Sequence, residues 1–143
     1  MSRIVMIGGH GKVALLAAPL LVDAGHEVVS LIRNPDHSAD VAATGATPLV
    51  LSVEEADVAE LTRVFAGADA IVWSAGAGGK GGPERTDAVD RAAAIRSMEA
   101  AAAAGVTRYV MVSFLTAYGE VPDDHPLRAY AIAKIAADRH LQT

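Results

Sequence analysis

The sequence contains no cysteine, which excludes disulfide cross-links, thiol catalysis and cysteine-ligated zinc. Aromatic residues make up only 4% of the 143 residues, although 52% are hydrophobic, so a core must be built from small and aliphatic side chains. No apolar run approaches the roughly 20 residues that a membrane-spanning helix needs. We therefore expect no contact with a membrane.

The chain also lacks a basic cluster, and its net charge of −5 argues against a general nucleic-acid binder. None of the five histidines lies three or four residues from another, so we predict no metal site. The first residues, Met1 to Val5, show no signal-peptide pattern. We expect a cytoplasmic protein.

Short apolar runs alternate with helical stretches from end to end. Apolar runs on both faces suit parallel strands covered by helices on each side, and the alternation predicts right-handed crossovers. We predict one domain over residues 1–143: an α/β, doubly wound Rossmann-type parallel sheet of about five strands with helices on both faces. The expected strands cover 4–7, 27–32, 48–51, 70–73 and 109–113, and the expected helices 12–24, 38–44, 58–65, 86–104 and 127–142.

Two local features of the expected helices leave choices open. Pro19 falls inside the first helix and should kink it or cost about 3 kcal/mol unless the local geometry adapts. Before the third helix, Ser52 with Glu55 forms one possible capping pair, and Asp57 is an equally good N-cap.

A glycine-rich turn follows the first strand. Small residues recur at Gly8, Gly11 and Ala14, which suits a tight turn, close approach of a pyrophosphate and close packing of helix on strand. The pattern favours nucleotide binding by Gly8, Gly11 and Val13 over a ligand-free turn. His10 and Lys12 either reach phosphates or are solvated loop residues.

Two further strand ends carry candidate cofactor contacts. Arg33 follows the second strand, where an acid would favour NAD and where an arginine can pair with the 2′-phosphate of NADP. The alternative is an exposed charge at a strand end. Ala75 and Gly76 follow the fourth strand, and their small size leaves room for a ribose and a diphosphate; a flexible loop is the alternative.

Tyr130 and Lys134 lie one helical turn apart on one expected helix. In carbonyl reduction, the lysine lowers the tyrosine pKa and holds the ribose, and the tyrosine donates a proton to the developing alkoxide. Ser113, at the end of the fifth expected strand, can polarise the same carbonyl. The alternative is a packed tyrosine and a solvated lysine.

Together these motifs resemble the short-chain dehydrogenase/reductase superfamily, specifically its atypical NAD(P)H-binding, NmrA-like branch. Further matches are the segments 25–28, 67–72, 75–80 and 109–113. The resemblance implies NADP as cofactor, with NAD less favoured, and a Ser113, Tyr130 and Lys134 site. It also places Ser52 and Val53 near the adenine, where members usually carry an acid, and Asp90 where classical relatives have an asparagine.

Members of this branch usually continue past residue 143 into a sixth strand and a substrate-binding segment. Without that strand, segment 109–113 would be an apolar sheet edge, through which copies of the chain could associate. We expect an NADP-dependent oxidoreductase that reduces a small carbonyl, quinone or flavin. The alternatives are a non-catalytic NADP-binding module that senses redox state and, more remotely, a nucleotide-sugar enzyme.

Overall fold

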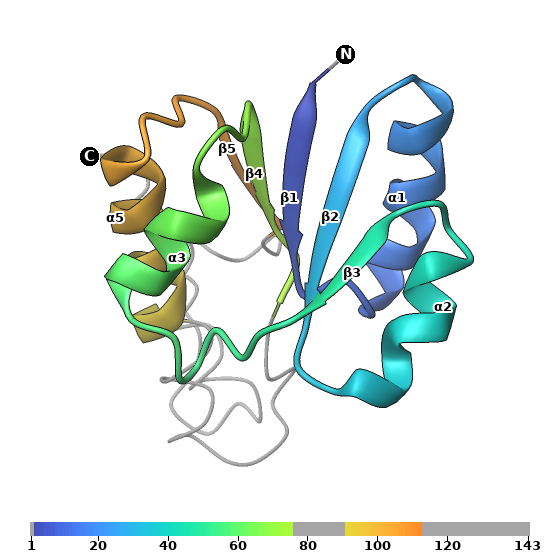
Figure 1. Ribbon diagram of the computed structural model, residues 1–143, viewed down its shortest axis with the longest axis horizontal. Coiled ribbons are helices and arrows are strands. Elements are labelled where there is room, and N and C mark those ends of the chain that lie inside the picture. Colours follow the sequence, from blue (N-terminus) through green and yellow to red (C-terminus); the bar gives the residue numbers. More distant parts are fainter. Residues whose placement is uncertain (1, 76–90, 113–143) are drawn as a thin grey trace, which may run out of the picture.

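The computed structural model describes residues 2–75 and 91–112, and in this part the strands form one parallel sheet (Figure 1). The strand order is β3-β2-β1-β4-β5, so the chain starts in the middle and winds outward in both directions. This confirms the predicted doubly wound sheet. The strands are β1 (Arg3–Ile7), β2 (Glu27–Ile32), β3 (Thr47–Val50), β4 (Ala70–Trp73) and β5 (Tyr109–Met111).

Helices cover both faces of the sheet (Figure 1). One face carries α1 (Lys12–Asp23) and α2 (Ser38–Ala42), which follows the short 3₁₀ helix η1 (Pro35–His37). The other face carries α3 (Val58–Phe65) and α5 (Ala94–Ala103), which pack side by side. No helix among the described residues combines the length and apolar character needed to cross a membrane.

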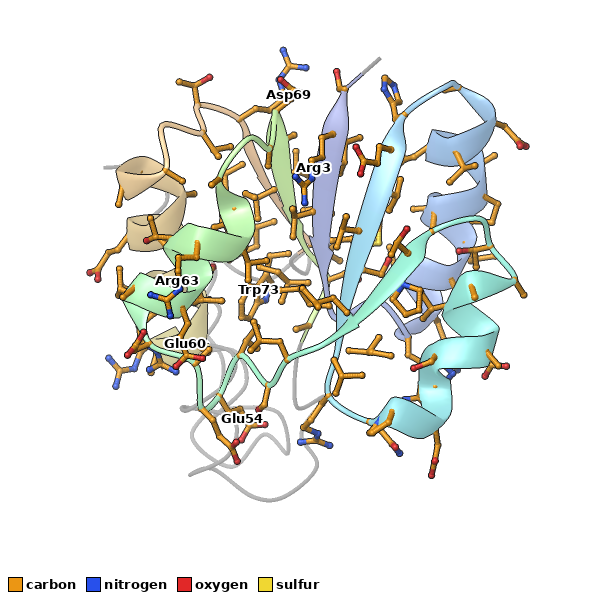
Figure 2. All side chains as sticks on the ribbon, in the orientation of Figure 1. Arg3, Glu54, Glu60, Arg63, Asp69 and Trp73 are labelled. Carbon is orange, nitrogen blue, oxygen red and sulfur yellow. The ribbon has the colours of Figure 1, made fainter. Side chains whose placement is uncertain are left out.

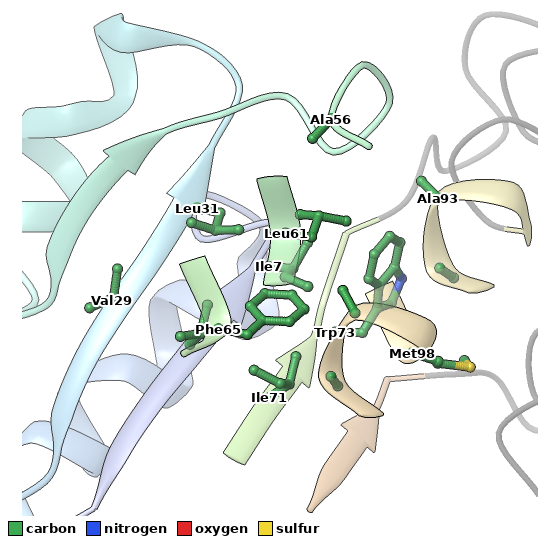
Figure 3. Packing of buried hydrophobic residues seen from close by; sticks show 14 residues of the cluster. Ile7, Val29, Leu31, Ala56, Leu61, Phe65, Ile71, Trp73, Ala93 and Met98 are labelled. Atoms are coloured by element: carbon green, nitrogen blue, oxygen red, sulfur yellow. The ribbon is translucent and has the colours of Figure 1, made fainter. Parts of the chain in front are cut away.

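The central strands send alternate side chains into two separate cores. In β1, Val5 and Ile7 face α3 and α5, whereas Met6 belongs to the cluster under α1. The larger core contains Phe65 and Trp73, both fully buried (Figure 3). Burial on both faces explains why these strands are continuously apolar in sequence.

Helices α3 and α1 contain the two local features for which the sequence leaves alternatives, the N-cap of α3 and Pro19 in α1. Asp57 caps α3 by accepting a hydrogen bond from the Glu60 amide at 2.8 Å, which favours the single N-cap over the Ser52 pair. Helix α1 continues through Pro19, so the proline does not end it. Ala14 and Ala18 are the buried residues of that helix, and their small size lets α1 lie close to the sheet.

The fourth expected helix lies only partly within the described residues. A π-helical turn at 91–93 precedes α5, and residues 76–90 lie outside the description, as does the helix expected over 127–142. Strand β5 pairs with β4 and stands at one end of the described strand order. Association of copies through that edge stays a prediction.

Tyr109 links β5 to α5 through a short hydrogen bond. Its hydroxyl lies 2.6 Å from Ser97 Oγ, and Ser97 donates its only hydroxyl hydrogen to the Ala94 carbonyl at 2.7 Å. Tyr109 is therefore the donor. Burial raises the pKa of Tyr109 well above its usual value of about 10.

This raised pKa predicts a specific alkaline response. The neutral phenol is favoured in the fold, so its contribution is complete below pH about 10 and is lost as pH rises toward the folded pKa. We expect Tyr109→Phe to cost about 1 kcal/mol of unfolding free energy at pH 7. Above pH 10, the wild type should lose up to about 1.4 kcal/mol per pH unit relative to the variant. Urea unfolding across pH 7–11 measures both; parallel pH curves would contradict this assignment.

Candidate functional site

The turn between β1 and α1 is bound to the carboxyl end of β2. The amides of Gly8 and Gly9 both donate to the Leu31 carbonyl, at 3.2 Å and 2.9 Å. The Gly11 amide donates back to the Gly8 carbonyl at 3.1 Å, which closes the turn. The turn is thus held at the edge where ligands bind in open α/β sheets.

Gly8 and Gly9 are required by close backbone approach. Gly8 has φ +79°, and a Cβ there would lie 2.5 Å from Ala75 Cα. A Cβ on Gly9 would lie 2.5 Å from the Cβ of Ser30, on β2. The sequence patterns identified Gly8 but not Gly9, whose requirement depends on a residue two elements away.

Gly11 differs from these two glycines. Its φ of −66° and ψ of 157° suit any residue, and a Cβ would make only ordinary contacts, at 3.4 Å and 3.5 Å. The backbone of the turn therefore does not require glycine at position 11. Gly11 is also the N-cap of α1, with no side-chain capping bond, so the helix start is left open. Lys12 and Val13, the next two residues, are exposed.

Arg33 leaves the carboxyl end of β2 and meets an acid from the loop after β3. Its Nη1 lies 3.2 Å from Glu54 Oε1, and the side chains are 60% and 26% exposed. Figure 2 shows Glu54 at the end of the molecule opposite Arg3 and Asp69, which mark the amino ends of β1 and β4. The acid that the sequence pattern lacks directly after β3 is thus present a few residues later.

The loop that carries Glu54 is fixed from both sides. The Leu51 amide donates to the Ile32 carbonyl at 2.9 Å, next to Arg33. From α5, Arg96 Nη2 donates to the carbonyls of Val53 and Glu54, each at 3.1 Å. Ser52 and Val53 are half-buried in this loop. No sequence pattern indicates Arg96 or Glu54, because their partners are distant along the chain.

His10 in the glycine turn also contacts a neighbouring acid. Its Nε2 lies 2.8 Å from Asp40 Oδ2, and its ring stacks on His37 with centroids 3.6 Å apart. These contacts join the turn to α2 and η1. The side chain of His10 is 31% exposed, and its observed partner is a carboxylate of the protein.

The end of β4 closes the other side of the turn. The Ser74 amide donates to the Ile7 carbonyl at 2.8 Å, and this places Ala75 against Gly8. The structure therefore brings together the candidates Gly8, His10, Gly11, Lys12, Val13, Arg33, Ser52, Val53 and Ala75 around the carboxyl edge of β1, β2 and β4. Gly76, Ser113, Tyr130 and Lys134 lie outside the described residues.

A family model described as NAD(P)H-binding matches residues 8–143, which begins at the first glycine of this turn. The chain belongs to this NAD(P)H-binding family. The match confirms the resemblance at the level of an NAD(P)H-binding family and the nucleotide-binding character that the glycine turn predicts, and it does not test the NmrA-like branch. It does not separate NADP from NAD.

Named relatives of this NAD(P)H-binding chain are longer proteins. A UPF0659 protein of Schizosaccharomyces pombe is 40% identical over 115 residues, covering 79% of this chain and 47% of that protein. An uncharacterized sugar epimerase, YhfK of Bacillus subtilis, is 32% identical, covering 98% and 65%. A solved putative NAD-dependent epimerase/dehydratase from Bacillus halodurans is 31% identical, with TM-score 0.89, covering 99% and 65%. The chain thus spans about half to two thirds of their lengths.

The geometry of the NAD(P)H-binding chain fits a dinucleotide at the glycine turn. The open start of α1 presents amide groups and the positive end of the helix dipole, which suit a pyrophosphate. Gly11 leaves space there that the fold itself does not require. Among the described residues, no three His, Asp or Glu side chains are grouped so that they could hold a metal.

Proposed function

We propose that the chain forms the cofactor-binding part of an NADP-dependent oxidoreductase that reduces a small carbonyl, quinone or flavin. The observation that carries the NADP preference is Arg33 at the carboxyl end of β2, beside the turn that Leu31 holds. In this fold that strand end lies at the adenosine ribose, and a guanidinium there can pair with a 2′-phosphate. The proposed protein acts in the cytoplasm.

The proposed chemistry rests on the chain's own side chains. When bound, the cofactor supplies a hydride. Tyr130 gives a proton to the carbonyl oxygen, Lys134 lowers the tyrosine pKa and holds the ribose, and Ser113 polarises the carbonyl. These three roles rest on sequence spacing and family resemblance, because the residues lie outside the described part of the chain.

Two other functions have support of their own. A non-catalytic NADP-binding module would need only the cofactor contacts at the glycine turn and at Arg33. An epimerase or dehydratase is favoured by the two Bacillus relatives, an uncharacterized sugar epimerase and a putative NAD-dependent epimerase/dehydratase. The three functions share cofactor binding and differ in turnover. An oxidoreductase oxidises NADPH with carbonyls, quinones or flavins, a module oxidises none, and an epimerase interconverts sugars without net oxidation.

Cofactor binding can be read from Trp73, the single tryptophan of the chain. We expect NADPH to quench its fluorescence with a lower Kd than NADH. Arg33→Gln should weaken NADPH binding about tenfold, since a charge-assisted hydrogen bond is lost, and should leave NADH binding unchanged.

Arg63→Gln is the matched control, because Arg63 is an exposed arginine on α3 and its loss changes the net charge equally. Equal affinity of the wild type for both nucleotides would contradict the NADP preference. Binding of neither nucleotide would contradict the proposed function. Turnover of NADPH across a panel of carbonyls, quinones and flavins then separates the oxidoreductase from the module.

A further inference from the structure

We propose that Glu54 is a specificity-determining residue, which limits the preference for NADP over NAD by competing with the cofactor's 2′-phosphate for Arg33. This inference rests on the proposed function, since it concerns the same adenosine site. It adds Glu54, which follows β3 and not β2 and which opposes the proposed NADP preference.

The first support is the ion pair itself. Arg33 Nη1 and Glu54 Oε1 are 3.2 Å apart, so the cation suited to a 2′-phosphate already has an anionic partner. Arg33 is 60% exposed and remains reachable from solvent. An ion pair with that exposure is weak, so a phosphate can displace it. The carboxylate then stays beside the incoming anion.

The second support is that the protein backbone fixes where Glu54 lies. Arg96 holds the Glu54 carbonyl and the carbonyl before it, each at 3.1 Å. The Leu51 amide joins the same loop to Ile32, the residue preceding Arg33. The backbone of Glu54 is therefore anchored near the end of β2 from two directions, which keeps its side chain within reach of Arg33.

The charges decide the direction of the effect. A phosphate monoester carries about −1.5 to −2 charges at pH 7, and a carboxylate a few ångströms away repels it. NAD has a neutral 2′-hydroxyl instead, which can donate a hydrogen bond to a carboxylate. Glu54 thus weakens NADP binding and does not oppose NAD binding. Its pairing with Arg33 lowers the selectivity that Arg33 alone would give.

His10, in the glycine turn, also has a carboxylate partner. His10 Nε2 lies 2.8 Å from Asp40 Oδ2, and Arg33 lies beside Glu54. Each of these two side chains therefore already has a carboxylate partner within the protein. This supports a site whose preference between the two cofactors is moderated by its own acids.

The test compares dissociation constants for NADP⁺ and NAD⁺ by isothermal titration calorimetry. In Glu54→Gln, which keeps the side-chain shape, we expect the ratio Kd(NAD⁺)/Kd(NADP⁺) to rise about tenfold at low ionic strength and less at high salt. Glu55→Gln is the matched control, because Glu55 is the exposed next residue and its change removes the same charge. We expect its ratio to stay within about twofold of the wild-type ratio.

The double variant Arg33→Gln/Glu54→Gln tests whether Glu54 acts through Arg33. If Glu54 acts by competing for Arg33, the effect of Glu54→Gln is smaller in the Arg33→Gln background. A full effect there, an equal effect of Glu55→Gln, or an unchanged ratio in folded Glu54→Gln overturns the inference and leaves the proposed function standing. Absence of binding of either nucleotide to the wild type overturns both. Thermal unfolding checks that each variant is folded.

Discussion

Replacing Gly8 with alanine should lower the free energy of unfolding by about 3 kcal/mol or more and weaken nucleotide binding about 100-fold. Two costs combine. Alanine at φ +79° costs about 1–2 kcal/mol, and its Cβ would lie 2.5 Å from the Ala75 backbone. Relief of that overlap must separate the turn from the end of β4. The amides at the start of α1 would then shift from the place where they meet a pyrophosphate.

Gly105→Ala separates the two costs. Gly105 has φ +78°, nearly the same as Gly8, but a Cβ there would find no atom within 4 Å. This control should therefore show the backbone cost of about 1–2 kcal/mol and unchanged nucleotide binding. Urea unfolding and NADPH titration of both variants measure the difference. If Gly8→Ala and Gly105→Ala proved equally stable and bound NADPH equally, the close approach to Ala75 would not matter.

The fold was accessible from sequence because its signals are local. Each strand is a short apolar run, and each β-to-α step recurs in order, so the parallel sheet and its central β1 could be predicted. Because both faces of the central strands are buried, however, the sequence does not show which residues point to which face of the sheet. Val5 and Met6 look alike in sequence, but they belong to different cores. Which helix covers which residue had to come from the structure.

The glycine turn shows where such signals end. The pattern predicts a tight turn with small residues at Gly8 and Gly11, but only Gly8 has a positive φ, and Gly11 has ordinary backbone angles. The reason for Gly9 lies in Ser30, a buried residue of β2, which no local pattern can indicate. A glycine required by the fold and one left free for a ligand look identical in sequence.

Paired charges were the least predictable part of the site. Arg33 was identified from its place after β2, whereas Glu54 appeared to be one of several acids in a loop. Their contact spans 21 residues, and that of Arg96 with the same loop spans 42 to 43. Such contacts depend on how β2, β3 and α5 converge. Sequence order alone cannot supply that, and so the restraint on Arg33 could not be foreseen.

Replacing Trp73 with alanine should lower the free energy of unfolding by about 3–5 kcal/mol. Trp73 is fully buried at the end of β4, where it fills the larger core beside Ala93 and Met98 (Figures 2 and 3). Few other bulky side chains are available to fill this core, since aromatic residues are only 4% of the chain. The small alanines of α5 cannot extend into the cavity that the substitution leaves.

Trp73→Phe tests the packing separately from the indole N–H. Trp73 Nε1 is buried and has no hydrogen-bond acceptor among the described residues, so phenylalanine removes an unsatisfied donor while it keeps most of the ring. We expect this variant to cost about 1 kcal/mol, because the relieved donor offsets part of the lost burial.

Leu16→Ala, at a side chain 74% exposed, should change stability by about 0.5 kcal/mol at most. Chemical unfolding followed by circular dichroism measures all three. Equal costs for alanine and phenylalanine at position 73 would contradict the packing role, because only alanine leaves a large cavity.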